Sequence, residues 1–228
     1  MVTLDNLPVK LAINDVFGIT EDVRLKAYHL LKKDFPTLPA VQMHLHKNIP
    51  MGAGLGGGSS DGTAALIILN QQFSLGLNDQ QLIEYASQLG SDCPFFVHNK
   101  ACHATGRGEI LTPIHLDLSN YQFLLVHPGV HIATAWAFQQ LNPHTKSESI
   151  QSIIEKPITD WKNSLINDFE APVFKAEPKL LVIKDQLYQL GAIYASMSGS
   201  GSSLFGIFPK DHFNQAPSIE HALRIDLI

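Results

Sequence analysis

Apolar residues recur along the first part of the chain with two different periods. Between residues 23 and 31 an apolar side chain returns at every third or fourth position, which predicts a helix over about residues 21–33 with Thr20 as its N-cap. Pro36 then stops this helix. Residues 41–46 alternate apolar and polar side chains instead, and this is the period of a strand with one buried face.

Two further helices are predicted downstream. Residues 61–70 are mostly small and apolar, which indicates a buried helix. Asn78, followed by Gln81 three positions later, has the spacing of a capping box, so another helix is expected to run to Leu89. The predicted order in this half is therefore helix, strand, glycine-rich segment, helix and helix.

The second half of the chain is richer in strand patterns. We expect strands at residues 121–126, 192–196 and 203–208, the last two joined by a glycine turn into a hairpin. Helices are expected at residues 134–141 and 178–190, and a glycine at the next position closes the second of them. Helices mixed with antiparallel strands predict an α+β fold rather than a regular alternation of parallel strands and helices.

One segment lacks any apolar period. Residues 142–149 are almost entirely polar and include a proline, which is typical of a connection between domains. We therefore place a boundary there, between an N-terminal lobe of residues 1–144 and a C-terminal lobe of residues 145–228.

Composition narrows the possible partners and surroundings of the chain. Of its 228 residues, 45% are apolar and the formal net charge is −5, with no cluster of Lys and Arg. We therefore expect no nucleic-acid partner and no membrane. The sequence shows no leader pattern and no membrane span, and its two cysteines, Cys93 and Cys102, are too few for a disulfide framework. A reduced, cytoplasmic protein is expected.

A segment with five glycines, residues 50–60, lies between the predicted strand and the predicted buried helix. Glycines let the backbone come close to an anion, and successive N–H groups at the start of a helix point at it. Phosphate is the natural ligand of such a segment. The alternative is a flexible connector without a ligand, which seldom lies between a patterned strand and an apolar helix.

Two common nucleotide-binding motifs fit this segment less well. Gly52, Gly54 and Gly57 have the spacing of the dinucleotide-binding fingerprint, but that motif requires a second parallel strand with an acidic residue about 20 positions later. Residues 70–89 are a predicted turn and helix instead. The Walker motif also fails, because no Lys-Ser or Lys-Thr pair follows the glycines.

The glycine-rich segment resembles the second motif of the GHMP kinase superfamily, a Pro-x-x-x-Gly-Leu-Gly loop that ends in two serines and opens a helix. The resemblance is closest to the branch that phosphorylates 4-diphosphocytidyl-2-C-methyl-D-erythritol. It extends over about residues 23–209, and residues 198–203 resemble the third motif of the superfamily. The other matching segments are residues 89–96, 104–109 and 127–130.

The resemblance implies a two-lobed α+β fold with ligands between the lobes. The N-terminal lobe would resemble domain 2 of ribosomal protein S5, and the C-terminal lobe would be ferredoxin-like. The implied reaction is transfer of phosphate from ATP, with Mg²⁺, to the 2-hydroxyl of 4-diphosphocytidyl-2-C-methyl-D-erythritol in non-mevalonate isoprenoid synthesis. A kinase for a sugar, homoserine or mevalonate and a nucleotide-binding remnant without catalysis are the alternatives. We expect a monomer or a homodimer.

Several residues acquire roles through the resemblance. The catalytic base of the superfamily falls on Asp92, which would accept the proton of the attacking hydroxyl. By itself, an Asp before Cys93 would be interpreted as a turn residue. Arg107 falls near the substrate, and Thr134 and Phe138 fall at its cytidine end by hydrogen bonding and ring contact. Core packing is the alternative role for Phe138, and a surface position without a role is the alternative for Arg107.

The nucleotide is expected to bind to the glycine-rich segment and to a lysine before it. These positions are Lys47, Pro50, Met51, Gly52, Ala53, Gly54, Leu55, Gly56, Gly57, Gly58, Ser59 and Ser60. A hydroxyl at the helix start, from Ser59 or Ser60, could also reach Mg²⁺. The eleven histidines show no metal-ligand spacing.

The chain departs from this branch near its start. Members begin with a strand carrying Asn-Ala-Lys-Ile-Asn-Leu, whose Lys stabilises the developing charge, followed by an Asp-Gly-Tyr-His segment that grips the cytosine. Neither motif is present in this sequence, so we expect a truncated start, weak ATP binding and poor phosphate transfer by these 228 residues. Residues 9–14, which include Lys10, match the lysine motif only in part, and Lys10 is interpreted as an exposed strand residue.

Overall fold

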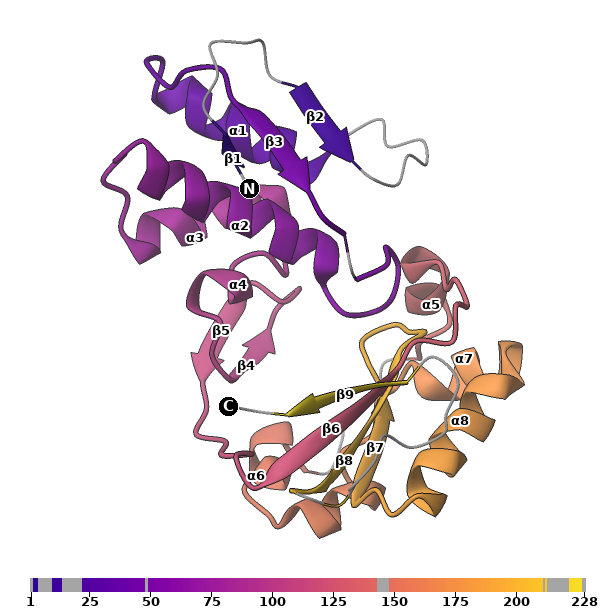
Figure 1. The fold of residues 1–228 in the computed structure, drawn as a ribbon. Coiled ribbons are helices and arrows are strands. Elements are labelled where there is room, and N and C mark those ends of the chain that lie inside the picture. The colour runs from indigo at the N-terminus through magenta and orange to yellow at the C-terminus, as the bar shows by residue number, and fades with distance from the viewer. Residues whose placement is uncertain are drawn as a thin grey trace. The chain divides into compact units, whose positions relative to one another are not determined.

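The chain forms two compact units in the computed structural model (Figure 1). The structure describes residues 2–3, 10–13, 22–47, 49–142, 148–210, 212 and 222–226. Unit 1 comprises Met1–Met51 and Gly56–Pro113, and unit 2 comprises Gly52–Leu55 and Ile114–Ile228. The observed division lies well before residue 144, where the sequence predicted the boundary. Most of the polar segment around that boundary, residues 143–147, lies outside the described residues.

In its described residues, unit 1 contains a small mixed sheet, a hairpin and a group of helices. Its elements are β1 (Val2–Thr3), β2 (Lys10–Ile13), α1 (Val23–Asp34), β3 (Gln42–Leu45), α2 (Gly57–Gln72), α3 (Asp79–Leu89), α4 (Phe95–His98), β4 (Cys102–Thr105) and β5 (Ile110–Pro113). Strand β3 is central, antiparallel to β1 and parallel to β2, while β4 and β5 form the separate antiparallel hairpin. The structure describes Lys10 in β2 only as backbone, so the interpretation of its side chain is not tested.

Local sequence explains where two helices of unit 1 begin. The side chain of Asp22 caps α1 by accepting a hydrogen bond of 2.8 Å from the backbone N–H of Arg24. The helix thus starts two residues later than predicted, and Thr20, the predicted cap, lies outside the described residues. The capping box between Asn78 and Gln81 is present at the start of α3, as predicted.

The core of unit 1 forms where α1, α2 and α3 pack together and against β3. Leu31 of α1, Leu66 of α2 and Ala86 of α3 are fully buried in it. Gly62 lets α1 and α2 approach closely, because a Cβ at this position would lie only 2.6 Å from the side chain of Val23. The glycine-rich segment is therefore followed by a helix, α2, that packs into the core of unit 1.

Unit 2 contains a four-stranded antiparallel sheet in its described residues, and the strands lie in the order β7-β8-β6-β9. Its elements are β6 (Tyr121–Val126), α5 (Thr134–Gln139), α6 (Ile150–Ile154), the 3₁₀ helix η1 (Ile158–Asn163), α7 (Glu170–Ala176), α8 (Pro178–Gln189), β7 (Tyr194–Met197), β8 (Leu204–Pro209) and β9 (Ala222–Asp226). This strand order is that of a ferredoxin-like sheet, as predicted for the C-terminal lobe.

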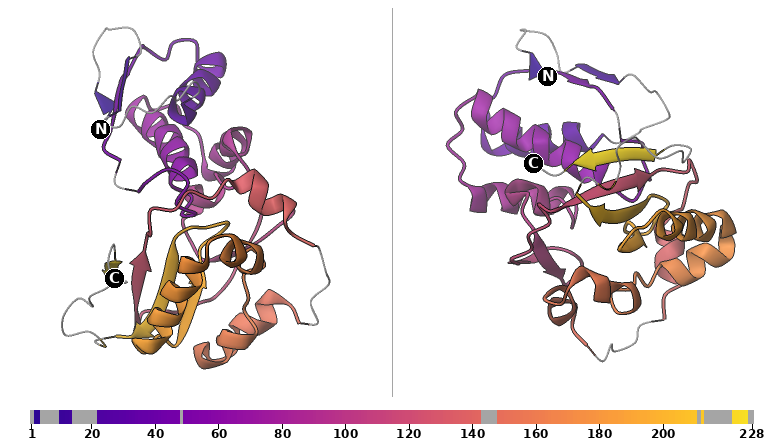
Figure 2. Two further views of the ribbon diagram at one scale, coloured as in Figure 1. Left: turned by 90° about the vertical axis from the view of Figure 1, so that its right-hand side faces the viewer. Right: turned by 60° about the horizontal axis from the view of Figure 1, so that its bottom comes forward.

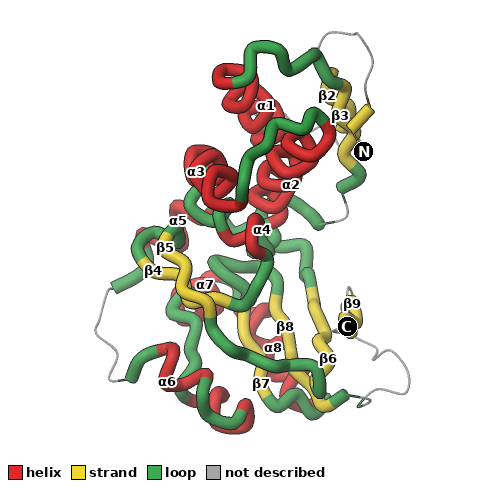
Figure 3. Tube along the Cα trace, turned by 90° about the vertical axis from the view of Figure 1, so that its left-hand side faces the viewer, coloured by secondary structure: helices red, strands yellow, loops and turns green. Residues whose placement is uncertain are grey.

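Helices cover both faces of this sheet. Helices α7 and α8 lie along one face (Figure 2), where Leu124 of β6 and Leu187 of α8 share a core. Alternate residues of the same strand point the other way, so Phe123 packs with Trp161 of η1 on the opposite side. Figure 3 shows β6, β7 and β8 side by side in front of α8. The sheet thereby fixes both ends of the turn between β7 and β8.

The pattern of apolar residues located most elements correctly. Strand β6 has the predicted bounds, and β7 and β8 form the predicted hairpin, although each starts one or two residues later than expected. Helix α2 begins at Gly57 instead of residue 61, because the last glycines and both serines of the segment are already helical. No strand occurs in the described residues 49–101, which excludes the dinucleotide-binding fingerprint.

In the described part of the chain, no helix combines the length and the apolar character that crossing a bilayer requires.

Candidate active site

The glycine-rich segment ends in the first turn of α2. Gly56 caps this helix with φ of 66°, a conformation that glycine adopts readily, and the N–H of Ser60 donates the first helical hydrogen bond to its carbonyl oxygen at 2.9 Å. The N–H groups of the three residues between them have no partner within the helix, because helix geometry leaves the first turn open. The dipole of this 16-residue helix adds a partial positive charge at the same place. The arrangement suits an anion.

The beginning of the same segment is held by the turn between β7 and β8, residues 198–203, which we call the clamp turn. The hydroxyl of Ser198 donates to the carbonyl oxygen of Gly54 at 2.8 Å, and the N–H of Ser203 donates to that of Ala53 at 3.1 Å. Gly54 has φ of 76°, and a Cβ there would overlap the carbonyl oxygen of Ser198 and lie 2.7 Å from that of Gly201. Only glycine fits this position.

Lys47 lies beside the start of α2. Its Nζ is 2.5 Å from Oδ2 of Asp61, and the two side chains are only 11% and 22% exposed. A Cβ built on Gly57 would be 3.1 Å from the same Nζ. The cation is thus fixed next to the open N–H groups of the helix, and a cation at this place would suit a bound phosphate.

Asp92 is exposed and lies against the loop that carries Arg107. A Cβ at Gly108 would be 3.0 Å from Oδ1 of Asp92, so the carboxylate faces this loop closely. The next residue, Cys93, accepts a hydrogen bond of 2.9 Å at its carbonyl oxygen from Oγ1 of Thr63 on α2. The candidate base is therefore tied to the helix whose first turn forms the candidate anion site.

The thiol of Cys93 links the same two segments. Burial raises the pKa of this thiol, hydrogen bonds with Ser59 and Thr63 act in the opposite direction, and the charge of Asp92 raises it again. The thiol therefore stays protonated near neutral pH and is no nucleophile. Its contact with Ser59 places the first turn of α2 next to the residue that follows the candidate base.

The candidate substrate residues are exposed. The side chain of Arg107 is 87% exposed, and its Nε lies 3.9 Å from Oε1 of Glu109, a surface ion pair of little strength. Thr134 is the first residue of α5, and its Oγ1 lies 3.3 Å from the hydroxyl of Ser200 in the clamp turn. Phe138 is 61% exposed and contacts the ring of Phe169 edge-on at 4.9 Å. Core packing, the alternative considered for Phe138, is therefore excluded.

Each unit brings together part of the predicted site. In unit 1, Lys47, the first turn of α2, Asp92 and the loop of Arg107 are connected by the contacts above. In unit 2, the beginning of the glycine-rich segment and Thr134 both contact the clamp turn. Among the described residues, no group of three or more His, Cys, Asp and Glu could hold a metal ion.

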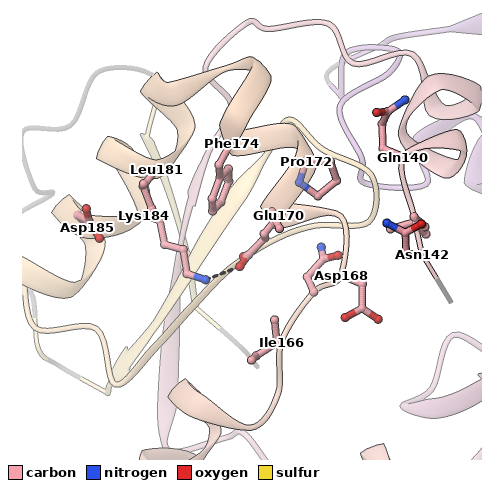
Figure 4. A pocket seen from close by; sticks show the side chains of 13 residues that line it. Gln140, Asn142, Ile166, Asp168, Glu170, Pro172, Phe174, Leu181, Lys184 and Asp185 are labelled. Atoms are coloured by element: carbon pink, nitrogen blue, oxygen red, sulfur yellow. Dashed lines mark hydrogen bonds and ion pairs between the residues drawn. The ribbon is translucent and has the colours of Figure 1, made fainter. Parts of the chain in front are cut away.

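A separate cavity of about 560 Å³ lies in unit 2 beside α7 and α8 (Figure 4). Phe174 and Leu181 supply apolar wall, and Lys184 points to Glu170 across it with Nζ and Oε2 2.5 Å apart. Asn167 also belongs to its lining. None of the predicted site residues lines this cavity, so it is distinct from the positions considered so far.

The family follows from comparison with known proteins. The model of the GHMP kinases N terminal domain matches residues 22–100, and the GHMP kinases C terminal model matches residues 152–227. The chain belongs to the GHMP kinases. These are phosphotransferases that use ATP as the phosphate donor, so the candidate anion site at the start of α2 lies in a kinase.

Individual relatives are similar over most of the chain. The 4-diphosphocytidyl-2-C-methyl-D-erythritol kinase of Azobacteroides pseudotrichonymphae genomovar. CFP2 is 50% identical over 195 residues, which are 85% of this chain and 73% of that protein. The kinase of the same name from Bacteroides fragilis is 50% identical over 184 residues, covering 81% and 67%. A crystal structure of 4-(cytidine 5'-diphospho)-2C-methyl-D-erythritol kinase has a TM-score of 0.77 at 28% identity, covering 92% and 78%.

Three residues of this GHMP kinase were missed by the sequence analysis. Asp61 pairs with Lys47, Ser198 holds Gly54, and Asn167 contacts the clamp turn at Gly199. An acidic residue directly after the two serines could have indicated the first of them. Ser198 lies in residues 198–203, which resemble the third motif of the superfamily, but the resemblance assigns no role to this serine.

Replacing Lys47 with Met should weaken ATP binding by on the order of tenfold or more, because a hydrogen bond between a charged group and phosphate contributes about 1.5–3 kcal/mol. The change also leaves Asp61 without its cation close to the phosphates. Calorimetric titration with ATP measures this effect. Lys100→Met, at an exposed position, is the matched control. Equal ATP affinities in both variants would remove Lys47 from the site.

Proposed function

We propose that this GHMP kinase transfers the γ-phosphate of ATP to the 2-hydroxyl of 4-diphosphocytidyl-2-C-methyl-D-erythritol. The geometric observation that carries the proposal is the connection between Asp92 and the start of α2. A candidate base and an anion site are joined there through Thr63 and Cys93. The choice of substrate rests on two relatives with 50% identity whose names state it.

In this proposal, Asp92 accepts the proton of the hydroxyl while the hydroxyl oxygen attacks the γ-phosphorus, the bond from that phosphorus to the bridging oxygen of ADP breaks, and ADP leaves. The first turn of α2 and Lys47 hold the phosphates and stabilise their charge. Phosphoryl transfer depends mainly on such positioning and electrostatic stabilisation, so few groups have to take part in covalent chemistry. Phe138, whose ring is largely exposed, is proposed to contact the cytosine together with Thr134.

Mg²⁺ is proposed to accompany ATP. The first turn of α2 offers the hydroxyls of Ser59 and Ser60, followed by the carboxylate of Asp61. Oxygen atoms are the ligands that Mg²⁺ prefers, and it commonly combines one or two protein groups with nucleotide phosphates. Bound there, the ion would neutralise phosphate charge. We further propose a cytoplasmic protein that acts as a monomer or a homodimer.

A substrate panel tests the proposed function. Release of ADP is measured with Mg-ATP and either 4-diphosphocytidyl-2-C-methyl-D-erythritol, homoserine or mevalonate as the acceptor. We expect kcat/KM to be highest for the cytidine compound by at least about a hundredfold, because a site built to hydrogen-bond one acceptor strongly rejects others. Faster turnover of another alcohol would replace the proposed substrate. Binding of ATP without turnover of any acceptor would favour a nucleotide-binding protein without catalysis.

A further inference from the structure

The clamp turn is supported from behind by one amide side chain. Nδ2 of Asn167 donates hydrogen bonds to the carbonyl oxygens of Met197 and Gly199, each at 2.8 Å. Its Oδ1 accepts a bond of 3.0 Å from the N–H of Phe169, which orients the amide. One hydrogen of the amide is therefore directed at the end of β7 and the other at the clamp turn, on either side of Ser198.

The other side of the turn holds the glycine-rich segment. Ser198, between the two carbonyls that Asn167 contacts, donates its hydroxyl to the carbonyl oxygen of Gly54 at 2.8 Å. Gly199 is also close, since a Cβ there would lie 3.3 Å from that oxygen. Asn167, the turn and Gly54 thus form a continuous series of hydrogen-bonded groups, all of them within unit 2.

A second support fixes the strand but not the turn itself. The carboxylate of Glu170 is buried and accepts hydrogen bonds from the N–H of Met197 at 2.8 Å and from the hydroxyl of Ser196 at 3.1 Å. Lys184 neutralises it from the cavity side (Figure 4). Glu170 therefore holds the N–H of Met197 at the end of β7 whether or not Asn167 is present. The contribution that only Asn167 makes falls on the position of residues 198 and 199.

We propose that Asn167 is a positioning residue for ATP, which acts by holding the clamp turn against the beginning of the phosphate-binding segment. It touches neither nucleotide nor substrate in this account. The inference rests on the proposed function, because it requires the segment that contains Gly54 to bind phosphate. Its effect should appear mainly in the affinity for ATP and much less in the KM for the alcohol.

Asn167→Asp is the variant that tests the proposal. It keeps the size of the side chain and the acceptor for Phe169, but it replaces two donors with a carboxylate oxygen that faces two carbonyl oxygens. We expect Kd for ATP to rise by about tenfold to a hundredfold, because two hydrogen bonds are lost and a repulsive contact is added. The KM for the alcohol should change by less than about threefold.

Asn70→Asp is the matched control. Asn70 lies in the last part of α2, donates from Nδ2 to the carbonyl oxygen of Leu77 at 2.9 Å and accepts from the N–H of the same residue at 3.0 Å. The chemical change and the loss of stability are thus comparable, without a contact to the clamp turn. ATP affinity should stay within about twofold of that of the unsubstituted protein.

Ser198→Ala is measured alongside, because it removes only the last hydrogen bond of the series and keeps the inference testable if Asn167→Asp does not fold. It should also raise Kd for ATP, and combining both changes should give less than the sum of their effects. Unchanged ATP affinity in the folded variants, with normal binding by the unsubstituted protein, would overturn this inference alone. An unsubstituted protein that binds no ATP would overturn the proposed function as well.

Discussion

Asp92→Asn is expected to reduce turnover by on the order of 10²–10⁴ while leaving ATP binding nearly unchanged. The amide has the shape of the carboxylate but cannot accept the proton of the attacking hydroxyl. Asp92 is exposed, and the contacts that fix its segment come from the carbonyl group and the thiol of Cys93. The substitution should therefore not disturb the fold. Stopped-flow or steady-state measurement of ADP release gives the rate, and titration gives the affinity for ATP.

Asp79→Asn is the control for this change, since Asp79 is an exposed carboxylate in the first turn of α3. It should reduce stability by about 0.3–1 kcal/mol through the helix dipole, with no effect on turnover. If Asp92→Asn lowered turnover less than tenfold under conditions where chemistry limits the rate, Asp92 would not be the base.

Gly54→Ala should weaken ATP binding by at least about thirtyfold. The residue has φ of 76°, and the added Cβ would overlap the carbonyl oxygen of Ser198 and lie 2.7 Å from that of Gly201. A left-handed backbone costs a non-glycine residue about 1–2 kcal/mol, and forcing atoms into a packed site costs about 1–3 kcal/mol more. The segment can avoid these costs only by moving away from the clamp turn. Titration with ATP measures the loss.

Gly58→Ala is the stability control for the loss of a glycine from the same segment. A Cβ at Gly58 meets no atom within 4 Å, and the residue is already helical. The free energy of unfolding of this variant should therefore rise, by at most about 0.5–1 kcal/mol, because Ala is favoured over Gly at helical positions. Thermal melts should show lower stability for Gly54→Ala and higher stability for Gly58→Ala. Full ATP affinity in Gly54→Ala would mean that the contact with the clamp turn has no part in nucleotide binding.

The sequence was most informative where one element depends on its own residues. The alternation of residues 121–126 identified β6, and Asn78 with Gln81 identified the start of α3, because both signals act over a few positions. The start of α2 was harder to predict from the sequence. Three consecutive glycines suggested a loop, yet the last two of them form helix, because packing along the rest of α2 outweighs their low propensity.

The site could be predicted only where a motif marks it. Family resemblance pointed to Asp92 and to the glycine-rich segment, and the structure connects them through Thr63, a residue that no local pattern distinguishes. Asn167 was missed for the same reason. Its contacts join positions about thirty residues apart, and the series reaches Gly54 at a separation of 144 residues. Such contacts depend on tertiary packing and have no period along the chain.

The pattern of the sequence also did not predict where the chain divides into units. A polar segment at residues 142–149 predicted a boundary, whereas in the folded chain β6 and α5 pack with the second unit. The reason is that β6 lies in the interior of the sheet between β8 and β9, and these strands come from the end of the chain. A strand that pairs with distant strands belongs to their unit, whatever the composition of the segment that follows it.

Phosphate transfer to the 2-hydroxyl is tested most directly by phosphorus NMR, which identifies the product formed from Mg-ATP and 4-diphosphocytidyl-2-C-methyl-D-erythritol. We predict a new monophosphate-ester resonance, coupled to the carbon that carried the 2-hydroxyl, which grows slowly as ADP appears and is almost absent with Asp92→Asn. Release of inorganic phosphate without a new ester, or an ester that forms equally fast with Asp92→Asn, would contradict phosphate transfer to the 2-hydroxyl with Asp92 as the base.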